Sequence, residues 1–212
     1  MKRLLDLCCH AGGAARGYRD AGFDVTGVDI APQPHYPYEF HQADALTFPL
    51  DGFDVVHIAA PCQLWSAYRR RPGVGDGYPD LIAPLRNRAI AAELPYVIEN
   101  VPGAPLKDPV TFCGSSFGLD VQRHRWIESS LPVTAPSCDH GIWTPRFPPA
   151  TNRTNLRRTV EIGVWRIPLA VQQRAMGIDW MTVRELSQAT PPAYTEHIGR
   201  QLLAAITQER AA

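Results

Sequence analysis

Short apolar runs alternate with helix-like segments along the first half of the chain. The strand-like runs are residues 4–8, 24–29, 53–60 and 96–99, and helical spacing covers residues 14–21 and 80–93. Short apolar strands that alternate with helices are typical of a parallel sheet with helices on both faces. We therefore predict an α/β protein with a doubly wound, mostly parallel sheet.

The pattern changes after residue 130. Residues 131–149 contain five prolines and show no periodicity, so a regular helix is excluded there. Helical spacing returns over residues 169–176 and 193–210. We predict three parts: a core over residues 1–130, a small Pro-rich insert over residues 131–168, and a helical segment over residues 169–212 that returns to the core.

Length and composition suit one domain without a membrane partner. A chain of 212 residues can bury a substantial core. Its first apolar stretch is too short for a signal peptide, and no run approaches the roughly 18 apolar residues of a membrane span. The five cysteines are an odd number and two are adjacent, which argues against a disulfide framework and favours a reducing cytoplasm.

Charge is unevenly distributed although the formal net charge is zero. Between residues 140 and 175 there are six arginines and one acidic residue, a local charge of +5. Codon usage in a GC-rich genome explains an excess of arginine over lysine as well as selection does, but it does not explain the clustering. A local arginine patch suits phosphate binding, whereas zero net charge argues against a non-specific nucleic-acid coat.

Cys62 is the candidate nucleophile. It lies in Pro61-Cys62-Gln63, directly after the strand-like run 53–60. A cysteine on a rigid turn at the end of a buried strand is well placed for nucleophilic attack. Taken alone, it is equally typical of a small buried hydrophobic residue.

A glycine-containing turn and two aspartates suggest a nucleotide site. The turn spans Asp6 to Gly13, and Asp29 ends the next strand. An acidic residue at that place accepts ribose hydroxyls in nucleotide-binding α/β folds. Asp44 ends a third strand-like segment and could bond an adenine amino group. Both aspartates could equally be helix caps or turn residues.

Three side chains have the chemistry of zinc ligands. Cys138 and His140 have a Cys-x-His spacing, and Cys113 lies upstream. A zinc site needs four ligands, or three and a water. No fourth ligand is evident in the sequence, so we expect no metal. His57, inside a strand-like run, is expected to be a core histidine.

Together the motifs resemble the DNA cytosine-5 methyltransferase family, in the family's order and over most of the chain. The resemblance is to a small, phage-like member with a reduced target-recognition region. The matching segments are Asp6 to Gly13, Asp29, Asp44, Pro61-Cys62-Gln63 with Ser66, Glu99-Asn100-Val101, Arg123 with Arg125, Met176-Gly177-Ile178, and residues 187–192.

The resemblance implies a Rossmann-like methyltransferase fold and the cofactor S-adenosylmethionine. The implied cofactor residues are Asp6, Cys8, Cys9, His10, Ala11, Gly12, Gly13, Asp29, Ile30, Asp44, Ala45, Pro61, Gln188 and Ala189. The implied substrate or DNA residues are Gln63, Ser66, Arg69, Arg70, Arg71, Asn100, Arg146, Arg153, Arg157 and Arg158.

The family's chemistry assigns the catalytic roles to four residues. The Cys62 thiolate would add to C6 of cytosine, which makes C5 able to attack a methyl group. Glu99 would hold and protonate N3, and Arg125 would contact the base carbonyl. Arg123 would brace the site or bind a phosphate. Because the ring face is inaccessible inside a duplex, the target base must be flipped out.

Departures from the family pattern leave alternatives open. Cys8, His10, Val121 and Gln188 replace the family's Phe, Gly, Gln and Asn, and about forty residues stand in for a recognition domain. An insert that short is expected to read only a short or degenerate target. The same chemistry on a free cytidine nucleotide or an RNA is the first alternative. A catalytically silent binding module is the second. We expect a monomer.

Overall fold

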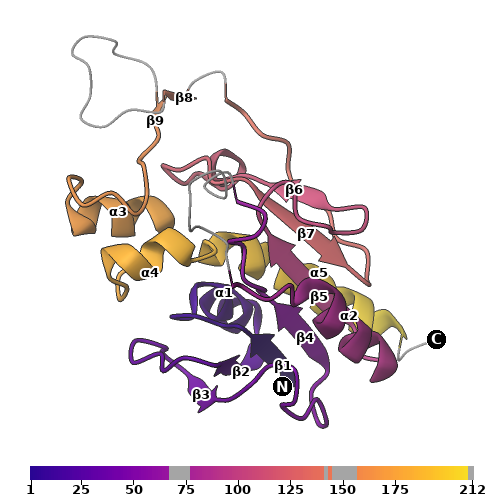
Figure 1. Cartoon of the computed structure of the whole chain (residues 1–212). Helices are drawn as coiled ribbons and strands as arrows, with labels where there is room; N and C mark the ends of the chain where they lie inside the picture. Colours follow the sequence, from indigo (N-terminus) through magenta and orange to yellow (C-terminus); the bar gives the residue numbers. More distant parts are fainter. Residues whose placement is uncertain (67–76, 141–142, 145–156, 210–212) are drawn as a thin grey trace.

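A seven-stranded sheet forms the centre of the computed structural model, which describes residues 1–66, 77–140, 143–144 and 157–209. The strand order is β3-β2-β1-β4-β5-β7-β6 (Figure 1). Strand β7 pairs antiparallel with both of its neighbours, and the other ladders are parallel. The bounds are β1 Lys2–Leu7, β2 Phe23–Asp29, β3 Glu39–Gln42, β4 Val55–Ile58, β5 Tyr96–Asn100, β6 Val110–Phe112 and β7 Arg125–Ser129.

Each central strand buries both of its faces, which explains its continuous apolar character. Side chains alternate along a strand, so Leu4 and Val97 contact one core cluster, while Leu5 and Ile98 contact another. The first cluster lies under helices α1 (Gly13–Ala21) and α5 (Pro192–Glu209). The second lies under helix α2 (Ile82–Ala91) and neighbouring loops. The predicted covering of both faces is confirmed.

Helices α1 and α5 approach each other closely because α1 carries a glycine at the contact. A Cβ at Gly17 would lie 2.0 Å from the backbone oxygen of Pro192, closer than any real contact. Thr195, fully buried on α5, donates its hydroxyl to the backbone oxygen of Ala14 over 2.8 Å. Glycine therefore lets α5 lie directly on α1.

Helix α5 closes one face of the sheet and is the longest of the described helices. Its Tyr194, Ile198 and Leu202 are fully buried beneath the sheet. Across the described part of the chain, no helix combines the length and the apolar character that a membrane crossing requires.

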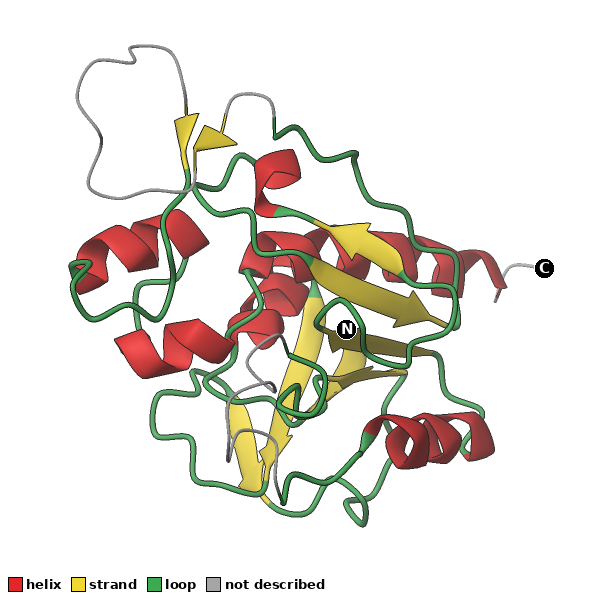
Figure 2. Cartoon of the chain, turned by 45° about the horizontal axis from the view of Figure 1, so that its top comes forward, coloured by secondary structure: helices red, strands yellow, loops and turns green. Residues whose placement is uncertain are grey.

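The C-terminal third adds two short helices, α3 (Leu169–Met176) and α4 (Val183–Gln188), which lie together at one side of the molecule (Figure 2). Met176, Ile178 and Leu186 form a third apolar cluster with Ala11 and Val121 from the core. This cluster attaches the C-terminal segment to the loop that follows β1.

Most predicted elements appear close to their predicted bounds. The segments not predicted as elements are β6, β7, α4, the short 3-10 helix η2 (Gly114–Phe117) and the two short strands of the insert. Strands β8 (Trp143–Thr144) and β9 (Arg157–Arg158) pair with each other within the predicted insert. The division into three parts stays a prediction.

Candidate active site

A cavity of about 860 Å³ opens at the carboxyl ends of β1 and β2, beside the point where the strand order reverses. Ligands of open α/β sheets bind at this place. Eight of the predicted cofactor residues line the cavity: Cys8, His10, Asp29, Ile30, Asp44, Ala45, Pro61 and Gln188. The volume is within the usual range of small-molecule sites.

Asp29 is the buried acid of this cavity. One of its oxygens accepts a hydrogen bond from the backbone N–H of His10 at 3.1 Å, and the other accepts one from Ala31 at 3.0 Å. A carboxylate oxygen has a second lone pair, so both can still accept from a ligand hydroxyl. Asp44 accepts from the backbone N–H of Leu46 at 2.8 Å and so also shapes its own turn.

The loop after β1 is held in an unusual conformation. Cys8 and His10 have positive φ angles of 60° and 45°, which residues other than glycine rarely adopt. Burial, together with the nearby Asp29, raises the pKa of the Cys8 thiol to about 12. Cys8 is therefore a neutral, weakly polar wall of the cavity at physiological pH.

A second, much smaller cavity contains three of the predicted catalytic residues. Cys62, Glu99 and Arg125 line it. His10, Gln63 and Gln188 line both cavities, so these three residues stand between the large cavity and the nucleophile. The two positions at which the chain departs most from the family pattern, His10 and Gln188, thus lie at the passage between the two spaces.

The Glu99–Arg125 ion pair results from the antiparallel strand. Glu99 is opposite Ile127 in the β5–β7 ladder, and Arg125 begins β7 at the end of the sheet where β5 finishes. The Arg125 Nε lies 2.6 Å from Glu99 Oε1, and both side chains are largely buried. Glu99 Oε1 has no hydrogen-bond partner among the described residues, so this contact is an ion pair and not a hydrogen bond, and both groups line the small cavity.

Cys62 is held by the turn that follows β4. The backbone N–H groups of Trp65 and Ser66 donate to the Cys62 carbonyl at 3.0 and 2.9 Å. Burial raises the pKa of the Cys62 thiol, Glu99 adds to that effect, and Arg125 opposes it. The free protein therefore holds a thiol at neutral pH. Substrate-binding by Ser66 stays a prediction.

Arg123 braces the site and lies off both cavities. Its guanidinium donates to the backbone oxygens of Ala189 at 2.8 Å and Ser187 at 2.7 Å. Its own φ is 35°, again in the left-handed region. Burial and the neighbouring Arg125 lower its pKa. Of the two roles predicted for Arg123, the contacts support bracing.

Six of the predicted cofactor residues do not line the large cavity, so their contact with a cofactor stays a prediction. Asp6 is fully buried and accepts from His57 across the β1–β4 ladder at 2.8 Å, which also confirms His57 as a core residue. A Cβ at Gly12 or Gly13 would collide with Pro37 or with the backbone of Thr190. Residues of this group that do not line the large cavity are Asp6, Cys9, Ala11, Gly12, Gly13 and Ala189.

Asn100 is likewise bonded within the protein. Its side-chain amide donates to the carbonyl of Ala60 at 2.9 Å, and its side-chain oxygen accepts from the backbone of Val101. The first bond joins the end of β5 to Ala60, two residues before Cys62, and the second is local to the turn after β5. Asn100 therefore positions the Cys62 turn and is not presented to either cavity.

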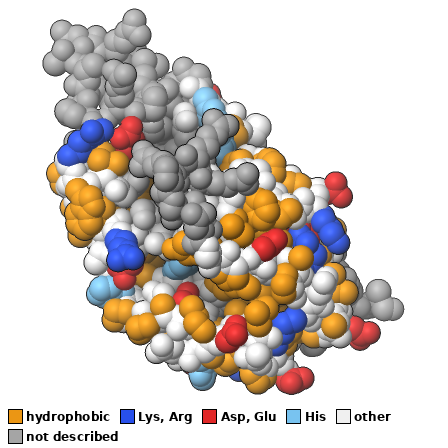
Figure 3. Space-filling view, in the orientation of Figure 1, with side chains coloured by type: hydrophobic (Ala, Val, Ile, Leu, Met, Phe, Trp, Pro, Cys, Tyr) orange, Lys and Arg blue, Asp and Glu red, His pale blue; other side chains and the backbone are white. Residues whose placement is uncertain are grey.

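The arginines predicted to bind phosphate remain untested. Arg69, Arg70, Arg71, Arg146 and Arg153 lie outside the described residues, and of Arg157 and Arg158 only the backbone strand β9 is described. On the face shown in Figure 3, the described Lys and Arg side chains are scattered among acidic ones.

The structure adds a ligand to the three metal-binding side chains found in the sequence. His124, between Arg123 and Arg125, lies with Cys113, Cys138 and His140 so that their ligand atoms are within 4.8 Å of one another. The expectation of no metal rested on a missing fourth ligand. His124 was not predicted as a ligand, because it lies between the two arginines that match the family motif.

We predict that Cys62 reacts with iodoacetamide only slowly at neutral pH, with a rate that still rises at alkaline pH, because the thiolate is the reactive form. In Glu99→Gln the midpoint of the pH dependence of the Cys62 reaction rate should move to lower pH. The variant loses the Glu99 charge that raises the pKa of the Cys62 thiol, and it frees Arg125, which lowers that pKa. Peptide mass spectrometry across a pH series measures the Cys62 rate. Glu93→Gln, at an exposed site before β5, is the control. An unchanged or higher midpoint in Glu99→Gln would contradict this electrostatic coupling.

No protein-family model and no curated protein sequence matches the chain. Solved structures do match it over almost its whole length. A protein from an E. coli prophage, described as a DNA modification methyltransferase, is 14% identical with a TM-score of 0.68 and covers 98% of this chain and 100% of its own. A DNMT2 mutant from Spodoptera frugiperda is 11% identical with a TM-score of 0.63, covering 96% and 100%.

The Dnmt2 methyltransferase of S. pombe is 10% identical with a TM-score of 0.57, and the match covers 96% of this chain and 99% of that one. At such low identity the likeness concerns the fold. The chain therefore shares the Rossmann-like fold of these methyltransferases.

Proposed function

We propose that this protein transfers a methyl group from S-adenosylmethionine to C5 of cytosine, with DNA as the acceptor. The observation that carries the proposal is the small cavity in which Cys62, Glu99 and Arg125 meet, next to a cavity that bears Asp29. The methyltransferases of similar fold, one of them described as a DNA modification enzyme, support the reaction class.

The large cavity has the features that a nucleoside cofactor requires. Asp29 keeps acceptor capacity for ribose hydroxyls, and Asp44 and Ala45 lie on the same wall for the base. Ile30, 71% exposed, offers an apolar surface for stacking. When bound, the cofactor supplies an electrophilic methyl group. His10 and Gln188 would lie near its reactive end, since they line the passage toward Cys62.

The residues of the small cavity suit covalent activation of a flipped cytosine. The Cys62 thiol gives up its proton to water, and the resulting thiolate forms a bond to C6. The C5–C6 double bond breaks, Glu99 delivers a proton to N3, and C5 becomes nucleophilic. Arg125 holds Glu99 in place and can bond the base carbonyl with its remaining donors. C5 then accepts the methyl group and loses its proton to a base. Cleavage of the sulfur–C6 bond frees Cys62.

Gln63 is a further residue for substrate binding. Its side-chain oxygen is buried without a hydrogen-bond partner in the described part of the chain, and the residue faces both cavities. An unpaired buried acceptor costs free energy unless a ligand donates to it. The exocyclic amine of cytosine is a donor of suitable size for this place.

A free cytidine nucleotide or an RNA is the second candidate acceptor. The neutral net charge and the scattered described cations favour it over a tightly held duplex. The chemistry at Cys62 would be the same for each acceptor, so only the acceptor has to be determined.

Labelled methyl transfer tests the proposal. We expect wild-type protein to move the tritiated methyl group of S-adenosylmethionine onto duplex DNA. Cys62→Ser should move none, because a serine hydroxyl is a much weaker acid than a thiol and cannot supply the anionic nucleophile. Single-stranded DNA, RNA and dCMP are offered in parallel. Label on only one of these three would identify that molecule as the acceptor in place of duplex DNA. Label on none of the four acceptors would refute the proposed activity.

Asp29→Ala is expected to weaken S-adenosylmethionine binding by roughly 1.5–3 kcal/mol, the value of hydrogen bonds to a charged group. That corresponds to a dissociation constant about ten to a hundred times larger. Isothermal titration calorimetry measures the change. Asp24→Ala, at an exposed acid on the same strand that pairs with Arg19, serves as the control. Equal affinity of Asp29→Ala and wild type would remove Asp29 from the cofactor site.

A further inference from the structure

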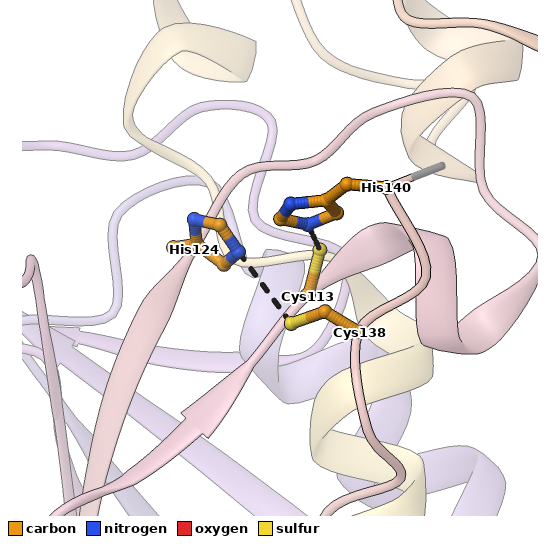
Figure 4. Close-up of side chains that lie close together, drawn as sticks. All are labelled: Cys113, His124, Cys138 and His140. Atoms are coloured by element: carbon orange, nitrogen blue, oxygen red, sulfur yellow. Dashed lines mark hydrogen bonds between the residues drawn. The ribbon is translucent and has the colours of Figure 1, made fainter. Parts of the chain in front are cut away.

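Two cysteines and two histidines from separate segments converge beside Arg123 and Arg125 (Figure 4). Cys113 directly follows β6, and His124 directly precedes β7. The β6–β7 ladder ends with Phe112 opposite Arg125, so the next pair along the two strands is Cys113 and His124. Cys138 and His140 come from the segment that leads into the predicted recognition insert.

The distances among the four side chains fit one tetrahedral ion. With Zn–S of about 2.3 Å and Zn–N of about 2.0 Å, neighbouring ligand atoms of a tetrahedral site lie about 3.5 Å apart. Cys113 Sγ lies 3.2 Å from His140 Nε2, and Cys138 Sγ lies 3.6 Å from His124 Nε2. All four ligand atoms lie within 4.8 Å of one another.

We propose that Cys113, His124, Cys138 and His140 bind one Zn²⁺ ion that fastens the start of the insert to the catalytic sheet. Thiolate and imidazole are the ligands that zinc prefers, and two of each complete a closed structural site. Binding displaces one proton from each thiol, so the two thiolates balance the charge of the ion. With four protein ligands there is no open position for a substrate.

Contacts around the cluster support a built site. The Ser115 hydroxyl lies 3.1 Å from Cys113 Sγ, as expected for a group that bonds a metal thiolate. The same hydroxyl accepts from the backbone N–H of Asp139 at 3.3 Å, and Ser116 donates to the carbonyl of Ser137 at 3.0 Å. These bonds hold residues 137–139 against η2, next to the candidate ligands Cys113 and Cys138.

The position of His124 links the ion to the active site. Its neighbours are Arg123, which braces residues 187–189, and Arg125, which pairs with Glu99. A metal bond to His124 would hold this three-residue turn, in which Arg123 has a φ of 35°. The zinc site itself does not rest on the proposed methyl transfer, whereas its effect on the arginines does.

Metal analysis tests the site directly. We expect protein purified without chelators to contain one equivalent of zinc by mass spectrometry. X-ray absorption should show two sulfur ligands at about 2.3 Å and two nitrogen ligands at about 2.0 Å. Cys138→Ser and His140→Ala, at exposed positions, should lose zinc on dialysis against a mild chelator while keeping the wild-type circular dichroism. Cys62→Ser and His41→Ala, which alter a cysteine and an exposed histidine outside the cluster, should retain it.

The intact chain provides a second measurement that needs no variant. Removing the metal with a strong chelator should lower the melting temperature and speed proteolysis after residue 130, and added Zn²⁺ should reverse both. Co²⁺ in its place should give the absorption of a tetrahedral thiolate complex. Absence of zinc together with failure to bind added Zn²⁺ or Co²⁺ would overturn the proposal. A Cys113–Cys138 disulfide that persists in protein purified and kept with a reducing agent would also overturn it. Zinc-containing wild-type protein that transfers no methyl group would contradict the proposed function and leave the zinc site standing.

Discussion

The reversed direction of β7 is the constraint on which the candidate active site depends. In a wholly parallel sheet, the residue that begins a strand lies at the opposite end from the residue that finishes its neighbour. Because β7 runs antiparallel to β5, Arg125 lies beside Glu99 with 2.6 Å between the charged groups. The same reversal brings His124 beside Cys113 at the end of β6. One strand direction thus places both the Glu99–Arg125 ion pair and the candidate metal ligands.

Hydrogen bonds from side chains to backbone carbonyls connect these groups to the rest of the protein. Asn100 joins the end of β5 to Ala60, just before the turn that carries Cys62. Arg123 joins the start of β7 to residues 187 and 189, next to Gln188 at the passage between the cavities. The candidate nucleophile Cys62, the Glu99–Arg125 ion pair and the wall of the large cavity are therefore held by the sheet and by the residues at the end of α4, and not by the described loops alone.

The sequence was sufficient for the parts of the fold that have a local signature. Strands β1, β2, β4 and β5 are apolar on both faces, and α1, α2, α3 and α5 carry helical spacing, so their existence and order could be predicted. Strands β6 and β7 were not predicted because Val110–Phe112 is short, and because Arg125 at the start of β7 and Glu128 within it interrupt its apolar pattern. Their pairing depends on contacts between distant segments.

The residues of the candidate site also fall into two groups, those with a local sequence signature and those whose partners are distant in the sequence. Cys62, Asp29 and Asp44 could be identified from their places at strand ends, and the structure puts them on the two cavities. The hydrogen bonds of Asp6 and Asn100 could not be predicted, because their partners, His57 and Ala60, are forty or more residues away. His124 was missed for a related reason: Cys113, Cys138 and His140 come together with it only when β6, β7 and residues 131–140 are folded.

The central claim is that Cys62 forms a bond to the cytosine ring, and covalent trapping measures it most directly. An acceptor carrying 5-fluorocytosine cannot lose a proton from C5, so the adduct should persist through denaturation once the methyl group has been transferred. Peptide mass spectrometry is then predicted to find the base attached to Cys62. Methylation of the ordinary acceptor without any such adduct, or an adduct on another cysteine, would contradict the account.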